Sequence, residues 1–238
     1  MNRYFFAAAA AVAMLLAGQK ASAAPVTFVE SWTGCYLGGN VGYGWSPTKW
    51  SDPASGIEFA SHTADGAVGG GQIGCDYQLD PQWVVGIRGM WDAAGLKGSS
   101  ANALNPALTD TSKVTWIATL TGRVGYVVEP RTMLYVQAGA AWAHAKYTEC
   151  CTPPTPPPPP IPDGFANVTR SGWTVGGGLE HKFTPHLSAF IEYDYIGLGG
   201  DDVTFTPTPP TTTPFVYHIE QNIHLILVGL NYRFGPFP

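Results

Sequence analysis

Polar and apolar side chains alternate along most of this chain, and this period of two constrains the fold more than any other feature. Between Met133 and Ala143, for example, Leu134, Val136 and Trp142 share one parity, and the other parity carries mostly small or polar residues. A β-strand places successive side chains on opposite faces, so the period predicts strands with one apolar face. The pattern recurs in eight segments, at 35–45, 67–79, 83–92, 116–126, 133–143, 173–183, 187–195 and 223–234.

The length of the segments is that of strands that cross a membrane at a tilt, which need about 9–11 residues. One face of each segment is apolar, and the other carries glycine and charges of both signs. A soluble barrel would turn the apolar face inward, whereas a membrane barrel turns it outward. The period alone does not choose between them.

The connections between the segments do choose, because short and long ones alternate strictly. In an antiparallel meander all long connections then fall at one end, which is the outer-membrane arrangement of short periplasmic turns and long extracellular loops. The chain is thus predicted to be all-β: an eight-stranded antiparallel up-and-down transmembrane β-barrel. The expected extracellular loops are 46–64, 93–112, 144–170 and 197–217.

The first 23 residues have the composition of an export signal. Arg3 precedes an apolar run at 4–17, which is too short for a membrane helix, and Ala21-Ser22-Ala23 fits a cleavage site. We expect a signal peptide at 1–23 and a mature outer-membrane barrel domain at 24–238.

Composition excludes other classes of protein. Only 12% of the residues are charged, about half the share usual in soluble domains. Twelve Lys and Arg residues do not make a nucleic-acid footprint, so no nucleic-acid partner is expected. The 29 Gly and 21 Pro residues argue against a helical bundle.

Aromatic residues gather at the ends of the predicted strands, as in the interfacial girdles of membrane barrels. One set, which includes Trp32 and Trp83, is expected at the periplasmic ends. The other set is the predicted extracellular girdle, which consists of Trp45, Trp91, Trp116, Trp142 and Trp173.

The charged residues of the strands are expected inside the barrel. Eight strands leave an interior just wide enough for side chains, and buried charges must pair. Two interpretations remain open: an ionic network that plugs the lumen, or a narrow polar pore. The predicted polar network of the lumen contains Arg88, Arg123, Glu180, Lys182, Glu192, Asp194 and Arg233, with Asp76 and Asp92 nearby.

Four cysteines lie in the exported part of the chain, where disulfides can form. Pairing the first two strands across their loop sets Cys35 opposite Cys75, so we expect either a cross-strand disulfide or two small lipid-facing thiols. For Cys150 and Cys151 a vicinal bond, an intermolecular bond and free thiols all stay open.

Several stretches, taken together, resemble a known family. They include Trp32 to Gly44, 69–74, 122–126, 172–180 and 228–234, and they run in order through the mature chain. The chain is similar to the small outer-membrane β-barrel proteins of alphaproteobacteria, the group of outer membrane immunogenic proteins and opacity-like surface antigens. The resemblance implies a protein of the Gram-negative outer membrane with an exposed, antigenic surface.

The last strand also resembles the signal that the barrel-assembly machinery recognises during insertion. Gly229, Tyr232 and Phe234 fit its glycine and hydrophobic positions. Leu227 departs from the pattern, since a polar residue is expected there, and so does the tail at 235–238.

One weak enzymatic pattern is present. His186 and Ser188 with Glu192 superficially match a lipid hydrolase, but the expected periplasmic turn is the wrong end for lipid of the outer leaflet. We therefore expect no enzyme and no cofactor or metal.

The expected function is that of a surface-exposed structural and antigenic component of the envelope whose lumen is largely filled by side chains. A small porin-like diffusion channel is the alternative. Outer-membrane lipid, including lipopolysaccharide, is the expected surrounding partner. The proline-rich tracts at 153–160 and 207–214 are either stiff spacers or adhesive loops for an unknown extracellular ligand.

Overall fold

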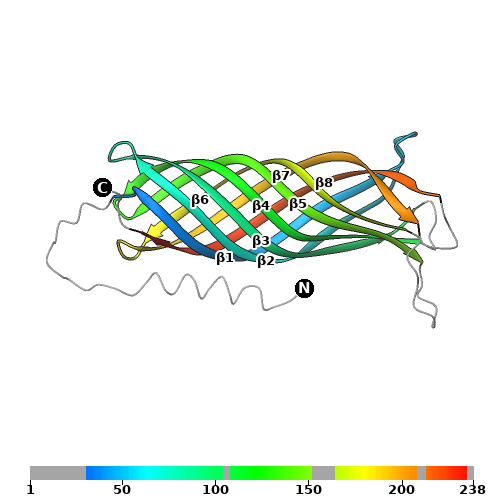
Figure 1. Cartoon of the computed structure of the whole chain (residues 1–238), viewed down its shortest axis with the longest axis horizontal. Helices are drawn as coiled ribbons and strands as arrows, with labels where there is room; N and C mark the ends of the chain where they lie inside the picture. Colours follow the sequence, from blue (N-terminus) through cyan, green and yellow to red (C-terminus); the bar gives the residue numbers. More distant parts are fainter. Residues whose placement is uncertain (1–30, 104–107, 152–163, 208–212, 235–238) are drawn as a thin grey trace.

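The eight strands form one closed barrel in which each strand pairs with its neighbours in sequence and β1 closes against β8 (Figure 1). The computed structural model describes residues 31–103, 108–151, 164–207 and 213–234, and every strand pair in this part is antiparallel. The strands are β1 Gly34–Ser51, β2 Glu58–Gln78, β3 Trp83–Ala101, β4 Leu108–Glu129, β5 Thr132–Cys151, β6 Gly164–Lys182, β7 Leu187–Pro207 and β8 Phe215–Arg233.

The strands are longer than their sequence pattern predicts, at 18 to 22 residues. The predicted loop at 46–64 shrinks to 52–57, and the edges of the other three predicted loops are also strand. Backbone hydrogen bonds between neighbouring strands continue past the membrane, because pairing satisfies the same backbone groups in water as in lipid. The proposed signal peptide at 1–23 and the proline tract at 153–160 lie outside the described residues.

The two halves of the barrel have opposite polarity. In the half with the short turns, Leu37 and Val136 point outward and are 55% and 64% exposed, while Arg88 points inward. In the half with the long connections, Trp50 and Phe205 point inward and are fully buried. The outside of the barrel faces hydrocarbon in one half and water in the other. Apolar side chains therefore point outward in the membrane half and inward in the half with the long connections.

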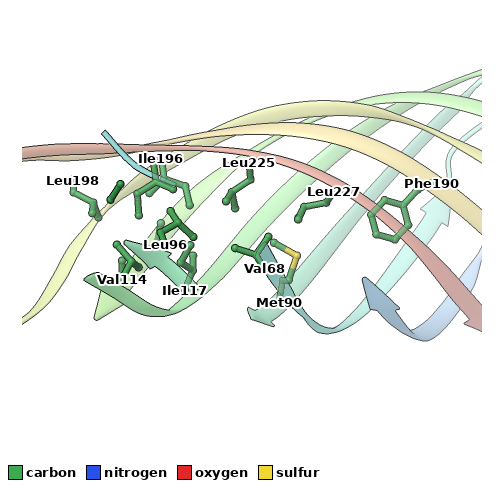
Figure 2. Packing of buried hydrophobic residues seen from close by; sticks show 14 residues of the cluster. Val68, Met90, Leu96, Val114, Ile117, Phe190, Ile196, Leu198, Leu225 and Leu227 are labelled. Atoms are coloured by element: carbon green, nitrogen blue, oxygen red, sulfur yellow. The ribbon is translucent and has the colours of Figure 1, made fainter. Parts of the chain in front are cut away.

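In the described part of the chain, buried apolar residues form three clusters along the axis of the lumen. The middle cluster includes Leu96, Ile117, Phe190 and Leu225, which come from β3, β4, β7 and β8 (Figure 2). An aromatic cluster around Trp50 fills the extracellular half. Side chains from several walls therefore meet across the barrel rather than line an open channel.

Trp32 corrects one prediction. Its indole is buried inside the periplasmic end of the barrel instead of joining the outer girdle. There Lys182 lies over the ring, with Nζ 4.2 Å from its centroid, and Arg233 Nη1 donates a hydrogen bond to the Trp32 carbonyl oxygen at 2.6 Å. Trp32 precedes β1, so strand parity does not set its direction. The ring therefore packs with Val84, Met133 and Tyr135 at the periplasmic end of the lumen.

Candidate functional site in the barrel lumen

Alternate strands supply successive layers of charged residues in the periplasmic half of the lumen. Asp76, Arg123, Glu180 and Arg233 come from β2, β4, β6 and β8 and form one layer. The next layer comes from odd-numbered strands and is centred on Arg88 of β3, which contacts Glu192 of β7. Such layering follows from the stagger of strands in a small barrel.

In the even-strand layer two arginines share two carboxylates. Arg123 donates from Nε to Oδ1 of Asp76 at 2.8 Å and from Nη1 to Oε2 of Glu180 at 3.0 Å. Arg233 donates from Nη2 to Oδ2 of Asp76 at 2.8 Å. The Arg123 guanidinium also lies 4.9 Å from the ring centroid of Tyr36. Charge-assisted contacts of this kind hold four walls of the barrel together.

The odd-strand layer is built around one ion pair with two parallel hydrogen bonds. The two terminal nitrogens of Arg88 each donate to one oxygen of Glu192 on β7, both at 2.8 Å. The side chains of the pair are 1% and 0% exposed. The hydroxyl of Tyr135 donates to the same carboxylate at 2.6 Å. This pair crosses the lumen between opposite walls.

Amide side chains extend the network toward the middle of the barrel. The amide of Asn40 donates to Asp92 at 2.9 Å, and that of Gln137 donates to Asp194 at 2.6 Å. Lys182 donates to the carbonyl oxygen of Ser31 at 2.7 Å, at the periplasmic end. All of the predicted lumen residues are thus buried inside the barrel, and each has a polar partner.

The predicted extracellular girdle lies on the outer surface of the barrel. Trp91 and Trp173 are each 55% exposed, and Trp142 is 37% exposed. Trp45 and Trp116 are half-buried because each stacks on a histidine of the neighbouring strand, with ring centroids 5.2 and 5.8 Å apart. Amphipathic rings in such a belt suit the boundary between hydrocarbon and headgroups.

Comparison with known proteins identifies this architecture. A family profile described as the outer membrane protein beta-barrel domain matches residues 7–234. The chain belongs to the outer membrane protein beta-barrel family. It is an outer-membrane protein, and the names of its curated relatives agree.

Two curated relatives of this beta-barrel family member come from Brucella. The 31 kDa outer-membrane immunogenic protein of Brucella melitensis is 32% identical over 90% of this chain and 88% of its own length. The 25 kDa outer-membrane immunogenic protein of Brucella abortus is 28% identical over 96% of this chain and 92% of its own length. The crystal structure of OprG from Pseudomonas aeruginosa has a TM-score of 0.51 and 11% identity, covering 87% of this chain and all of that one, and it shows the fold alone.

Two of the predicted assembly residues of this family member, Gly229 and Tyr232, lie on β8, and the third, Phe234, directly follows it. Tyr232 and Phe234 point outward and are 52% and 49% exposed, as lipid-facing aromatics should be. Gly229 lies against the ring of Phe190, and a Cβ at this position would come within 2.5 Å of it. Leu227 points into the lumen and is fully buried, which explains why an apolar residue occupies a position where a polar one was expected.

The residues of the enzymatic pattern are engaged in structural contacts in this beta-barrel family member. His186 contacts the backbone oxygen of Arg233 through Nδ1 at 3.0 Å. Ser188 donates to Glu180 at 2.6 Å, while Glu192 holds an arginine. In these contacts Ser188 bonds to Glu180 and His186 to the backbone, so they do not link the serine and histidine of the pattern. In the described ranges, no group of three or more His, Cys, Asp or Glu residues is arranged to hold a metal.

The cysteines of the family member lie at both ends of the barrel. Cys35 and Cys75 are register partners on β1 and β2, and a disulfide joins them. Cys150 lies on β5 opposite Thr109, and the side chain of Cys151 is outside the described part.

Sequence reasoning missed the inward residues of the extracellular half of this family member. Asp110 and Glu149 face the lumen there and are 0% and 3% exposed. Burial and the charge of Glu149 raise the pKa of Asp110 to about 7. One signal could have predicted that the strands continue into this half. Inside the predicted loops, apolar residues such as Trp50, Phe59 and Tyr147 alternate with polar ones.

Proposed function

We propose that this outer-membrane protein is a surface-exposed structural and antigenic component of the envelope whose lumen does not conduct. The single observation that carries the proposal is the filled lumen. Two layers of paired charges occupy the periplasmic half, and a buried apolar cluster spans the barrel beyond them. A solute would have to break buried ion pairs and then cross an apolar zone.

The non-enzymatic part of the proposal has separate support. Brucella relatives are named as outer-membrane immunogenic proteins. The one hydroxyl of the enzymatic pattern, Ser188, is 2% exposed and hydrogen-bonded to a carboxylate. We expect the Ser188→Ala variant to fold. Cells that carry it should have the same lipid composition in the outer leaflet as cells with the wild type.

Planar-bilayer recording of the refolded mature chain tests the proposal. We expect no discrete conductance steps from the wild type, or from Arg88→Ala and Arg123→Ala in the fraction that folds. Successful insertion is checked on the same samples by heat-modifiable gel mobility. Reproducible steps from the wild type would overturn the proposal and favour the alternative, a small diffusion channel.

A matched pair of variants locates the barrier. Leu227 points into the apolar zone and is fully buried, whereas Leu230 on the same strand points outward and is 53% exposed. If this apolar cluster is the barrier, Leu227→Ala will admit occasional current and Leu230→Ala will not. Equal behaviour of the two variants would show that the barrier lies in the charged layers.

A further inference from the structure

A row of three lysines crosses the outer surface of the extracellular half. Lys97 on β3 is the register partner of Lys113 on β4, and Lys113 is the partner of Lys146 on β5. All three side chains are exposed. Directly opposed side chains on neighbouring strands lie about 5 Å apart at Cβ, and like charges in that position destabilise a sheet. The row therefore carries a cost in the isolated protein.

Carboxylates among the described residues offset this repulsion at one end of the row at most. None of the three lysines forms a salt bridge with a residue in the described ranges. Asp65 on β2 is the register partner of Lys97 and also accepts a hydrogen bond from Tyr43, so its charge acts on the β2 end of the row and leaves Lys113 between two lysines. The acids of the same strands, Asp110 and Glu149, point into the lumen.

The neighbours of the lysine row on the outer surface are hydrogen-bonding groups. One row farther from the membrane, Ser99, Thr111 and Thr148 are register partners across the same three strands. Asn167 of β6 continues the lysine row beside Lys146. Ammonium groups bordered by hydroxyl and amide groups suit an anion with several oxygen acceptors, such as a phosphate.

The height of the row relative to the aromatic girdle points to a lipid. Lys146 follows the girdle residue Trp142 by four positions on β5. At about 3.4 Å per residue and a tilt of about 40°, the row lies roughly 10 Å above the girdle. Girdle rings mark the headgroup level, so the lysines lie at the outer edge of the headgroups.

The opposite wall of the barrel has the reverse charge. Asp202 on β7 and Glu220 on β8 are exposed there, and Lys49 on β1 is paired with Glu58 at 3.4 Å. Lys49 is also the register partner of Glu220. Among the described residues, the wall formed by β3, β4 and β5 carries three neighbouring cations with a carboxylate beside only one end of the row, so the site is confined to one side.

We propose that Lys97, Lys113 and Lys146 form a binding site for the phosphate groups of a phosphorylated glycolipid in the outer leaflet. The bound phosphates offset the repulsion along the row and anchor one side of the barrel to the lipid. The proposal rests on the outer-membrane location and deepens the lipid contact of the proposed function. It does not depend on whether the lumen conducts.

Thermal unfolding of the refolded mature chain in vesicles tests the proposal. Phosphatidylcholine vesicles are compared with vesicles that also contain bisphosphorylated lipid A or fully dephosphorylated lipid A. Unfolding is followed by heat-modifiable gel mobility. We expect bisphosphorylated lipid A to raise the Tm of the wild type by about 2–6 °C, and dephosphorylated lipid A to have little effect.

The variant that removes the site is Lys97→Gln/Lys113→Gln/Lys146→Gln, and the matched control is Lys49→Gln. In phosphatidylcholine alone the triple variant should be at least as stable as the wild type, because the repulsion is gone. With bisphosphorylated lipid A it should lose the gain in Tm, whereas Lys49→Gln should keep it. High salt should shrink the gain of the wild type.

Two results would overturn the site. One is an equal gain in Tm for the triple variant and the wild type. The other is a full gain produced by inorganic phosphate in vesicles without lipid A, since that would show a site for free anions. A chain that conducts but still shows the lysine-dependent gain would refute only the proposed non-conducting role. A chain extracted from membranes by carbonate would refute both.

Discussion

The ion pair between Arg88 and Glu192 provides a direct test of whether the lumen is dry. Its two hydrogen bonds measure 2.8 Å, and the two side chains are 1% and 0% exposed. Glu192→Gln removes one charge with little change in volume and leaves the guanidinium buried without its counter-charge. Breaking a buried pair in this way costs about 3–5 kcal/mol. If water filled the lumen, the loss would be that of an exposed pair, about 0–1 kcal/mol.

A double-mutant cycle isolates the interaction from other effects of each substitution. The cycle compares Arg88→Met, Glu192→Gln and the double variant, using urea unfolding in lipid vesicles. We expect the double variant to be more stable than either single variant, because no uncompensated charge remains. The coupling free energy should be at least about 2 kcal/mol.

The exposed pair Lys49–Glu58 serves as the internal control. Its side chains are 57% and 46% exposed, so the same cycle should give a coupling of about 0–1 kcal/mol. A coupling for Arg88 and Glu192 no larger than that of this control would refute the reasoning. It would show that water in the lumen screens the charges of the ion pair, and it would contradict the proposal of a lumen that does not conduct.

Three other predictions concern separate parts of the barrel. Asp110, in the extracellular half, has its pKa raised to about 7 by burial and a neighbouring carboxylate. The folded chain therefore holds a proton that the unfolded chain releases above about pH 4, so stability falls as pH rises from about 4 to 7. Asp110→Asn should abolish this fall in thermal unfolding measured across that range, and an unchanged slope would contradict the assignment. Reduction of the disulfide between Cys35 and Cys75, which are 40 residues apart, should cost up to about 4 kcal/mol by chain entropy. The comparison of the Tm with and without reductant checks this, and an equal Tm would count against a stabilising disulfide. Gly229→Ala should reduce the folded fraction after insertion, because the new Cβ would meet an aromatic ring at 2.5 Å and a carbonyl oxygen at 2.6 Å. Gly89→Ala is the control, since nothing lies within 4 Å of its Cβ position, and equal folded fractions would refute the steric argument.

The strand pattern and the spacing of connections were sufficient to predict the membrane half of the barrel. Residues such as Leu134 and Val136 share one parity, and both point outward in the structure. The alternation of long and short connections placed all long loops at one end. Both signals are local, because the parity of a strand and the length of a turn depend only on neighbouring residues.

The extracellular half could not be predicted from the same rule. Trp50 and Phe205 lie inside the barrel, although apolar residues of the membrane half lie outside. The rule that apolar means outward holds only where the outer solvent is hydrocarbon. Parity does not show where along the strand that solvent ends, so segments that continue as strands were interpreted as loops.

The sequence by itself determined the period, the number of strands in the meander and the face on which each charge of the membrane half lies. The tertiary structure decided which charges meet. Arg88 finds Glu192 across the lumen, 104 residues away in the chain, and Lys97 lies beside Lys113 and Lys146 only because of the register of three strands. Register and closure depend on hydrogen bonds and packing between distant segments, and the energy of a charged group depends on what those contacts place beside it.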